Sequence, residues 1–558
     1  DERNVLKDQG EALVDSGPPH LVTSTTMTKL QEAAQQRRTF AIISHPDAGK
    51  TTLTEKLLLY GGAIQLAGTV KAKASHRRAT SDWMELEKQR GISVTSTVLQ
   101  FPYEGHTINL LDTPGHNDFS ADTYRTLTAA DSAVMLVDNA KGVEAQTRKL
   151  FAVCRRRGIP IFTFVNKMDH EGMGPLAIME DIEVALGIRS VPMNWPIGQG
   201  GTFTGVYDRQ TRLIHLYQKT VRGATKAEVG SISIDDPDAV SVLGKEHFNQ
   251  LVEDIDLLDI AADPFDADRV AAGELTPIFF GSALTNFGVE PFLKTFIALA
   301  PQPASRKAED QVVHPEDDFS AFVFKIQANM NPEHRDRIAF LRIVSGSFEK
   351  DMDVIHVQSG REFKISRPQR VFAQEREILE EAYPGDIIGI PNPGFLRLGD
   401  TLALNQKVKY DEVPGFTPEI FAAISSLDAS RFKHFDKGVH QLAQEGLIDL
   451  FEDPDSHTKQ YIFGAVGALQ FDVVKFRLQA EYGCKTATMP LSQSLIAWVK
   501  GDLKELESFY MGSDIRRLLD TQGRTVLLFN SQFQMNHMAG RAKGFQLLTE
   551  PEGQPIGI

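Results

Sequence analysis

Nine consecutive residues combine a tight turn, a lysine and two threonines in an order that binds phosphate groups. The apolar run 40–43 before them predicts a buried strand, and the pattern over 53–60 predicts a helix. A loop between a strand and a helix directs backbone N–H groups inward, and the helix N-terminus adds a partial positive charge. The candidate nucleotide-binding residues of this loop are Ser44, His45, Pro46, Asp47, Ala48, Gly49, Lys50, Thr51 and Thr52.

Two residues of this loop have expected roles in chemistry. Lys50 is expected to reach the β- and γ-phosphates, and the Thr51 hydroxyl to occupy a Mg²⁺ position. Ser44 replaces the first glycine of the usual G-x-x-x-x-G-K-[ST] pattern. A chance Gly-Lys-Thr turn is the alternative, and a phosphate loop alone allows kinases, ATPases and GTPases.

A second segment places a carboxylate at the end of the predicted strand 108–111. Such a carboxylate lies in the crevice where α/β sheets bind their ligands, so Asp112 is expected to hold Mg²⁺, through a water molecule. Gly115 can bring its N–H against the γ-phosphate because no side chain intervenes. The candidate residues are Asp112, Thr113, Pro114, Gly115 and His116.

A third segment, after the predicted strand 161–165, indicates which base is bound. Guanine presents a ring N–H and an amino group that one carboxylate can accept, whereas adenine would leave that acceptor unpaired. Asp169 is expected to make this contact, Lys167 to lie over the base and Asn166 to brace the loops; a helix-capping turn is the alternative. The candidate residues are Asn166, Lys167, Met168 and Asp169, followed later by Gly281, Ser282 and Ala283, which could contact the guanine carbonyl.

Ser93, at the end of segment 90–93, carries a hydroxyl that could complete the Mg²⁺ site while GTP is present. A loop that lets go after hydrolysis acts as a switch. A plain exposed serine is the alternative for this residue alone. Taken together, the four segments indicate GTP/GDP and Mg²⁺ as ligands, with Thr51, Ser93 and Asp112 as the candidate metal residues.

Composition limits the classes of protein that could carry this site. The 558 residues suggest three or four domains, and the net charge of −15 argues against a general nucleic-acid coat. Only two cysteines occur, so a disulfide framework is not expected, which suits a reducing cytoplasm. No apolar run reaches the ~20 residues that span a bilayer. A cytoplasmic location without membrane contact is therefore expected.

The pattern of strands and helices over 36–300, which must position the site, predicts an α/β doubly wound domain. Short apolar runs at 108–111, 133–137, 161–165 and 277–280 fit a parallel sheet buried on both faces, and 146–157 fits a covering helix. The alternation weakens over 196–275, which is expected to be an insertion. Residues 1–35 are expected to be a leader, disordered or non-native, with Met27 as a possible start.

Two further domains are predicted after the linker 301–317. Short strand patterns over 318–410, separated by Gly-containing turns, favour a β-barrel. The order strand, helix, strand, strand, helix, strand within 415–545 is the split βαββαβ (ferredoxin-like) arrangement. No organisation is predicted beyond about residue 490, and 546–558 is expected to be a frayed tail.

Segments 44–52, 90–93 and 112–116 resemble the translational GTPases, and segments 322–330 and 464–474 resemble the branch that acts after peptide release. The resemblance covers roughly 30–530. It implies a GTP-binding domain, a barrel and a third α/β domain. It also implies, as partners, the bacterial 70S ribosome, with ribosomal RNA near the GTP-binding domain, and class 1 release factors, whose departure the protein would promote. A monomer is expected.

The resemblance also implies a catalytic set of His116, Lys50 and Gly115. His116 would orient the attacking water when ribosomal RNA positions it, rather than act as a strong base. Ser93 stands where elongation factors have threonine, so weaker switch ordering is expected. Another translational GTPase, of elongation or ribosome-protection type, and a GTP-binding scaffold without turnover remain the alternatives.

Overall fold

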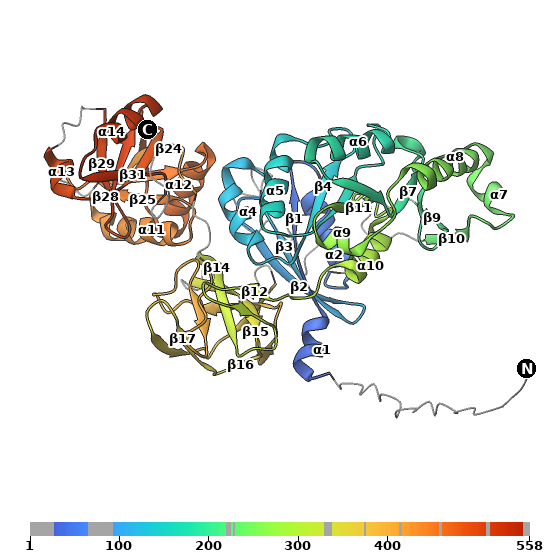
Figure 1. Ribbon diagram of the computed structural model, residues 1–558, viewed down its shortest axis with the longest axis horizontal. Helices are drawn as coiled ribbons and strands as arrows, with labels where there is room; N and C mark the ends of the chain where they lie inside the picture. Colours follow the sequence, from blue (N-terminus) through green and yellow to red (C-terminus); the bar gives the residue numbers. More distant parts are fainter. Residues whose placement is uncertain are drawn as a thin grey trace, which may run out of the picture.

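The computed structural model contains three domains in chain order (Figure 1). It describes residues 27–64, 93–218, 225–226, 229–328, 337–372, 375–411, 416–456, 460–508 and 514–550. The nucleotide-binding domain runs from blue to green in the figure, the barrel is yellow and the third domain is orange to red. The α/β, β-barrel and βαββαβ architecture predicted from the sequence is confirmed. Residues 1–26 and 90–92, on which predictions were made, lie outside the described residues.

The nucleotide-binding domain is built on a seven-stranded sheet of order β2-β3-β1-β4-β5-β11-β6. Neighbouring strands are parallel except for the antiparallel pair β2 and β3. The strands are β1 (Arg37–Ser44), β2 (Thr97–Tyr103), β3 (His106–Asp112), β4 (Ser132–Asp138), β5 (Ile161–Asn166), β6 (Arg189–Pro192) and β11 (Leu275–Phe280).

Helices cover both faces of this sheet, which is why its central strands are apolar throughout. Phe40 and Ile42 of β1 pack on one face with α2 (Lys50–Tyr60) and α10 (Val289–Leu299). Ala41 and Ile43, the alternate residues, pack on the other face. That face is covered by α5 (Ala145–Arg156) and α6 (Pro175–Leu186); η1 (Asn117–Phe119), α4 (Ser120–Leu127) and α9 (Ala267–Ala271) complete the domain.

The insertion forms a separate four-stranded antiparallel sheet of order β10-β9-β8-β7. Trp195 of its first strand donates through Nε1 to Asp254 of a long helix, 2.9 Å away, and thereby joins the sheet to that helix. Its elements are β7 (Asn194–Ile197), η2 (Gly200–Thr202), β8 (Gly205–Asp208), β9 (Leu213–Tyr217), β10 (Val229–Ser233), α7 (Ala239–Leu243) and α8 (Lys245–Ala261).

The end of the predicted leader is folded, which corrects that prediction for residues 29–35. Helix α1 (Lys29–Gln35) begins with a capping box, in which Thr28 and Gln31 satisfy each other's backbone N–H groups. Lys29 donates to Glu381 of the barrel at 2.8 Å. The polar composition of this stretch concealed a helix that a local cap and a distant partner stabilise.

The barrel contains an eight-stranded antiparallel sheet of order β18-β17-β23-β14-β15-β22-β19-β20. Its strand β14 is buried on both sides, because Ala321 and Val323 face the barrel core while Phe322 and Phe324 join the core of the nucleotide-binding domain. The strands are β14 (Ser320–Ala328), β15 (Arg337–Ser345), β16 (Phe348–Glu349), β17 (Asp353–His356), β18 (Arg361–Lys364), β19 (Gln369–Phe372), β20 (Glu375–Ile378), β21 (Glu381–Ala382), β22 (Ile387–Pro391) and β23 (Thr401–Ala403). The predicted linker contains a short ribbon, β12 (Arg306–Lys307) and β13 (Val312–Val313).

The third domain repeats one arrangement twice. Its first half has strand order β27-β24-β26-β25 and its second half β29-β30-β28-β31, and β25 pairs with β29 to make one eight-stranded sheet. The first half is β24 (Ile420–Ser426), η4 (Ala429–Arg431), α11 (Phe432–Gln444), β25 (Asp449–Glu452), β26 (Tyr461–Ala465), α12 (Ala468–Tyr482) and β27 (Thr486–Pro490). The second is β28 (Leu495–Gly501), α13 (Leu503–Ser508), β29 (Arg516–Asp520), β30 (Thr525–Phe529), α14 (Gln532–Arg541) and β31 (Phe545–Leu548).

This second βαββαβ unit is the part that the sequence interpretation left unorganised. The helix-free faces of the two halves share one core, in which Phe421 and Ile462 meet Trp498 and Leu528. Strand β31 lies partly within the predicted frayed tail, so that prediction is wrong for residues 546–548. Within the described ranges, no helix has the length and apolar composition needed to cross a membrane.

Candidate nucleotide-binding site

The loop between β1 and α2 has a backbone shape that demands glycine at one position. Gly49, the residue before α2, has φ +95°, a region that side chains rarely adopt. A Cβ atom on Gly49 would also lie 2.3 Å from Nδ2 of Asn166. Lys50 therefore begins the helix directly behind a turn that only glycine can form, and the first N–H groups of α2 are free of a side-chain cap.

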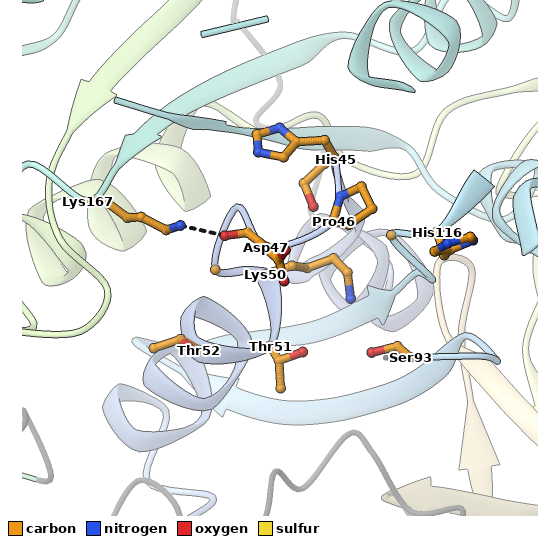
Figure 2. Close-up of a pocket in the computed structure, with 12 residues that line it drawn as sticks. His45, Pro46, Asp47, Lys50, Thr51, Thr52, Ser93, His116 and Lys167 are labelled. Carbon is orange, nitrogen blue, oxygen red and sulfur yellow. Dashed lines mark hydrogen bonds between the residues drawn. The ribbon is translucent and has the colours of Figure 1, made fainter. Parts of the chain in front are cut away.

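A cavity of about 340 Å³ opens above this loop (Figure 2). Twelve residues line it, and all twelve are among the candidate site residues predicted from the sequence. They are Ser44, His45, Pro46, Asp47, Gly49, Lys50, Thr51, Thr52, Ser93, Gly115, His116 and Lys167. Residues from β1, α2 and four separate loops thus meet at the carboxyl ends of the central strands, where α/β sheets bind ligands.

The remaining candidates surround this cavity without lining it. Asp112 lies directly behind Lys50, whose Nζ donates to Asp112 Oδ1 at 2.6 Å. The Thr113 hydroxyl donates to the carbonyl of Ile42 on β1, and Pro114 accepts from Thr123 of α4. These contacts fix the loop that carries Gly115 and His116.

The candidate Mg²⁺ residues fit a hard cation of that kind. Asp112 Oδ2 is buried and has no hydrogen-bond partner among the described residues, and carboxylate and hydroxyl oxygens are the ligands that Mg²⁺ prefers. Thr51 and Ser93 both line the cavity, and Figure 2 shows their hydroxyls on the side of Lys50. In the part of the chain that the structure describes, no group of three His, Cys, Asp or Glu side chains forms a metal cage. A metal held here would therefore depend on hydroxyl and phosphate oxygens as well as Asp112.

Asn166 holds three candidate loops together. Its Nδ2 donates to the carbonyl of Ala48 in the phosphate loop, and its Oδ1 accepts from the N–H of Ala283, both at 2.8 Å. The N–H of Met168 donates to the carbonyl of Gly281 at 3.1 Å. The sequence interpretation gave Asn166 this bracing role, and these hydrogen bonds are its geometric basis.

Lys167 spans the cavity toward the phosphate loop. It has φ +67°, and its Nζ donates to the carbonyl of Asp47 at 2.6 Å (Figure 2). The same ammonium donates to Asp138 Oδ2 at 2.8 Å. The aliphatic stem of Lys167 consequently crosses the opening where a base would lie.

Asp169 carries the acceptor expected for guanine. Its Oδ1 is buried and makes no hydrogen bond within the part of the chain that the structure describes, while its Oδ2 lies 3.5 Å from Nε2 of the exposed His170. A buried acceptor without a partner is costly unless a ligand satisfies it. Asp169 stands beside the cavity rather than in its lining.

Asp138, at the end of β4, is a site residue that the sequence interpretation missed. Burial alone would raise its pKa, but hydrogen bonds from Lys167 and from the N–H of Ala140 outweigh burial and hold the pKa below its ordinary value. Its position at a carboxyl strand end, like that of Asp112, was the signal available in the sequence.

His116 lies at the edge of the cavity, where its ring extends away from the Lys50 ammonium (Figure 2). The N–H of Asp118 donates to its Nδ1 at 3.3 Å, and the side chain is about one-third exposed, 34%. His45, by contrast, is fully buried behind the phosphate loop with its Nε2 3.7 Å from Glu144. Burial lowers the pKa of His45, so this imidazole is neutral at pH 7.

The segment after Ser93 is anchored by two other parts of the chain. Asp122 of α4 accepts from the N–H of Ser96 at 2.5 Å, and Lys325 of β14 donates to the Ser96 carbonyl. Neither contact has a signal in the sequence, because each joins residues that only the tertiary fold brings together.

Comparison with known families assigns each domain separately. The Elongation factor Tu GTP binding domain model matches residues 35–302, and the Elongation factor G domain 2 model matches 318–405. The model of the Class II release factor RF3, C-terminal domain, matches 410–539. The three matches follow the three domains of the structure.

Curated relatives match nearly the whole chain. Peptide chain release factor 3 of Symbiobacterium thermophilum is 56% identical over 519 residues, which cover 93% of this chain and 98% of the relative. Proteins of the same name from Synechococcus elongatus and Acaryochloris marina are 52% and 53% identical, with 95% and 92% of this chain covered and 96% and 95% of those relatives. A solved structure from Thermus thermophilus shares the fold with a TM-score of 0.66 at 23% identity, over 88% of this chain and 72% of that one.

Proposed function

The chain belongs to the peptide chain release factor 3 family of translational GTPases, and from this membership we propose that it acts on the ribosome at translation termination. It would bind GTP, promote the departure of class 1 release factors after peptide release, and leave after hydrolysis. The observation that carries the proposal is the match of 410–539 to the release factor C-terminal domain, on the same chain as an assembled GTP site. The place of action would be the cytoplasm, and the working form a monomer.

Selectivity for guanine is supported by the unpaired acceptor of Asp169. A guanine ring N–H and amino group would both donate to this carboxylate, while the Lys167 stem would cover one face of the base. The N–H of Ser282 already donates to the Phe287 carbonyl and that of Ala283 to Asn166 Oδ1, so these residues would support the base-binding loop, and a contact with the guanine carbonyl would require one of these bonds to open. An adenine would leave Asp169 buried without a donor, which is the kind of mismatch that gives selectivities of about 10⁴–10⁵.

The phosphates would lie against the loop 44–52 and the start of α2. Lys50 and the backbone N–H groups would neutralise the charge that develops as the bond to the γ-phosphate breaks. Thr51, Ser93 and Asp112 would hold Mg²⁺, which supplies charge neutralisation and orients the phosphate oxygens. On nucleotide binding, Lys50 would exchange part of its contact with Asp112 for the phosphates.

Hydrolysis converts GTP and water to GDP and phosphate. His116 would orient the water molecule that attacks the γ-phosphate, and Gly115 would donate its N–H to that phosphate. Because the His116 ring lies at the cavity edge, it must turn inward before it can do so, and contact with the ribosome would supply that turn. Hydrolysis would then be slow in the free protein and fast on the ribosome.

The decisive experiment follows the departure of a labelled class 1 release factor from post-termination ribosomes. Adding this protein with GTP should release the labelled factor rapidly, and omitting the protein should leave it bound. In parallel, multiple-turnover GTP hydrolysis should rise strongly on adding 70S ribosomes. Hydrolysis without release of the factor would favour another translational GTPase activity, and binding without ribosome-stimulated turnover would favour a scaffold.

A further inference from the structure

The turn that follows His116 reaches from the nucleotide cavity to the third domain. Asp118, within η1, accepts through Oδ2 a hydrogen bond from the N–H of Leu469, at 2.8 Å. Leu469 lies in the first turn of α12, where backbone N–H groups have no partner inside the helix. A carboxylate of the nucleotide-binding domain thus caps a helix that begins some 350 residues later in the chain, since this pair is separated by 351 positions.

Gly467, the residue before α12, leaves the space that this carboxylate occupies. A Cβ atom on Gly467 would lie 2.1 Å from Cγ of Asp118 and within 2.4 Å of both of its oxygens. The φ of Gly467 is −149°, an extended conformation that any residue adopts. The backbone would accept a side chain at position 467, but that side chain would have to displace the Asp118 carboxylate.

The same carboxylate contacts His116. Asp118 Oδ1 and the Asp118 backbone nitrogen each lie 3.3 Å from Nδ1 of His116, so a protonated Nδ1 donates to the carboxylate, whereas an unprotonated Nδ1 accepts from the N–H. The imidazole is thereby held on the side of the turn, at the edge of the cavity (Figure 2). One side chain consequently connects the ring that must turn inward to the helix of another domain.

An apolar cluster supports this connection. Phe119, next to Asp118, is buried with Val473 of α12 and with Val94, which follows Ser93. One turn further along α4, Arg125 donates to the carbonyl of Gly446 at 2.7 Å. The segment after Ser93 and the turn after His116 therefore both rest on the third domain, and a displacement of α12 would release them together.

We propose that Asp118 is a positioning residue that holds His116 at the cavity edge as long as α12 is docked on its carboxylate. Moving α12 away frees the 116–119 turn and lets the imidazole approach the γ-phosphate. The position of the third domain thus sets the rate of hydrolysis. This inference rests on the proposed function in one respect, because it takes His116 as the residue that orients the water.

The test compares Gly467→Ala, Asp118→Ala and the double variant in single-turnover GTP hydrolysis without ribosomes. Each single variant should raise the rate about fivefold, the scale of a modest coupling between sites. The GDP dissociation constant should stay within about twofold of wild type, which also shows that the nucleotide-binding domain is folded. In the double variant the rate should equal that of Asp118→Ala alone, because Gly467→Ala acts only by displacing that carboxylate.

Two matched controls use the same substitutions where no such contact exists. Gly540→Ala adds a methyl group in α14 with nothing within 4 Å of it. Asp266→Ala removes a carboxylate that caps α9 and that does not line the cavity. Both should leave the ribosome-free rate unchanged.

Unchanged rates in both single variants, or fully additive effects in the double variant, would overturn the inference. A failure of the proposed function is recognised elsewhere: wild type would show no stimulation by ribosomes, or His116→Ala would keep full turnover. Since the positioning test uses no ribosomes, the two results are separable.

Discussion

At the residue scale, the buried oxygen of Asp169 is the group that we propose selects guanine. Replacing Asp169 by Asn puts a donor where guanine needs an acceptor, and xanthine offers the matching carbonyl. Asp169→Asn should lower GTP affinity by at least about 100-fold and raise affinity for xanthosine triphosphate. Equilibrium binding of fluorescent GDP with competing nucleotides measures both, with Asp266→Asn as the control. If the variant bound each nucleotide with the same affinity as wild type, another residue would have to recognise the base.

His116 is placed to affect chemistry without affecting binding. Its ring lies at the cavity edge and makes its hydrogen bond within its own turn. His116→Ala should therefore keep GDP affinity within about twofold and cut ribosome-stimulated turnover about 100-fold or more. Stopped-flow phosphate release gives the rate and mant-GDP titration the affinity. Loss of GDP affinity would instead identify a structural histidine.

His45 makes the stability of the nucleotide-binding domain depend on pH. Its folded-state pKa lies below the ordinary value near 6.5 because the ring is buried. As the pH falls, the unfolded chain therefore binds a proton at His45 before the folded chain does. The contribution of neutral His45 to the free energy of unfolding is fully present above about pH 6.5 and declines as the pH falls below it.

A urea titration at pH 7.5 and at pH 5.5 tests this expectation. Between these two values, His45→Gln should lose less unfolding free energy than wild type, because glutamine does not titrate. Replacing the exposed His170 by Gln should leave the pH dependence of wild type intact. If wild type and His45→Gln lost the same unfolding free energy between pH 7.5 and pH 5.5, the pH dependence would belong to other groups.

At the element scale, the turn into α2 is the most constrained piece of backbone in the site. Gly49→Ala forces a side chain into φ +95° and against Asn166, which itself braces two other loops. The variant should be destabilised by about 1–3 kcal/mol and should bind GDP weakly.

Gly174→Ala is the matched control for that prediction, because Gly174 precedes α6 with φ −65° and has open space around it. Thermal unfolding with and without GDP measures both effects. If Gly49→Ala kept wild-type stability and affinity, the turn would have to be more adaptable than its geometry indicates.

The sequence predicted the elements whose signals are local. The strands ending at Asp112 and Asn166 are apolar runs followed by polar residues, and both features can be recognised in the amino-acid sequence. Helix α1 was missed because its stabilising partner, Glu381, lies in another domain. The second βαββαβ unit was missed because β29 and β31 are short and take their places only by pairing with β25 and β28.

The site shows the same division. Residues that touch a nucleotide follow motifs, and all twelve residues lining the cavity were anticipated. Residues that position those motifs from outside, such as Asp122 and Lys325, follow none. Their roles depend on which strand ends and domain surfaces meet, and one sequence does not contain that information.

At the scale of the whole molecule, the barrel is fixed rigidly to the nucleotide-binding domain. A single nitrogen of Arg342 donates to both oxygens of Asp131 at 2.7 Å, and another donates to the Gly385 carbonyl. Both partners of the ion pair are largely buried. Arg342→Lys cannot make all of these contacts, so it should lower the unfolding free energy by about 2 kcal/mol.

Differential scanning calorimetry measures this effect and also reports whether the two domains unfold together. Lys364→Met is the control, because its pair with Asp353 is exposed and should contribute almost nothing. A single transition that moves to lower temperature is expected for Arg342→Lys. An unchanged midpoint would show that the apolar contacts of β14 alone fix the two domains.

The contact between β1 and the barrel also has a consequence for folding during synthesis. Arg37 donates to Asp386, a residue 349 positions later in the chain, and Thr39 donates to the neighbouring Gly385 carbonyl. At about 5–20 residues per second, a nascent chain would wait roughly 20–70 s between making β1 and making its partner. The sheet of the nucleotide-binding domain is complete once β11 has been made, and from then until residues 385–386 follow, the surface that will contact the barrel stays uncovered. The nascent chain therefore passes through an intermediate in which the nucleotide-binding domain lacks the barrel. The surface that the barrel later covers is where a chaperone would bind this intermediate.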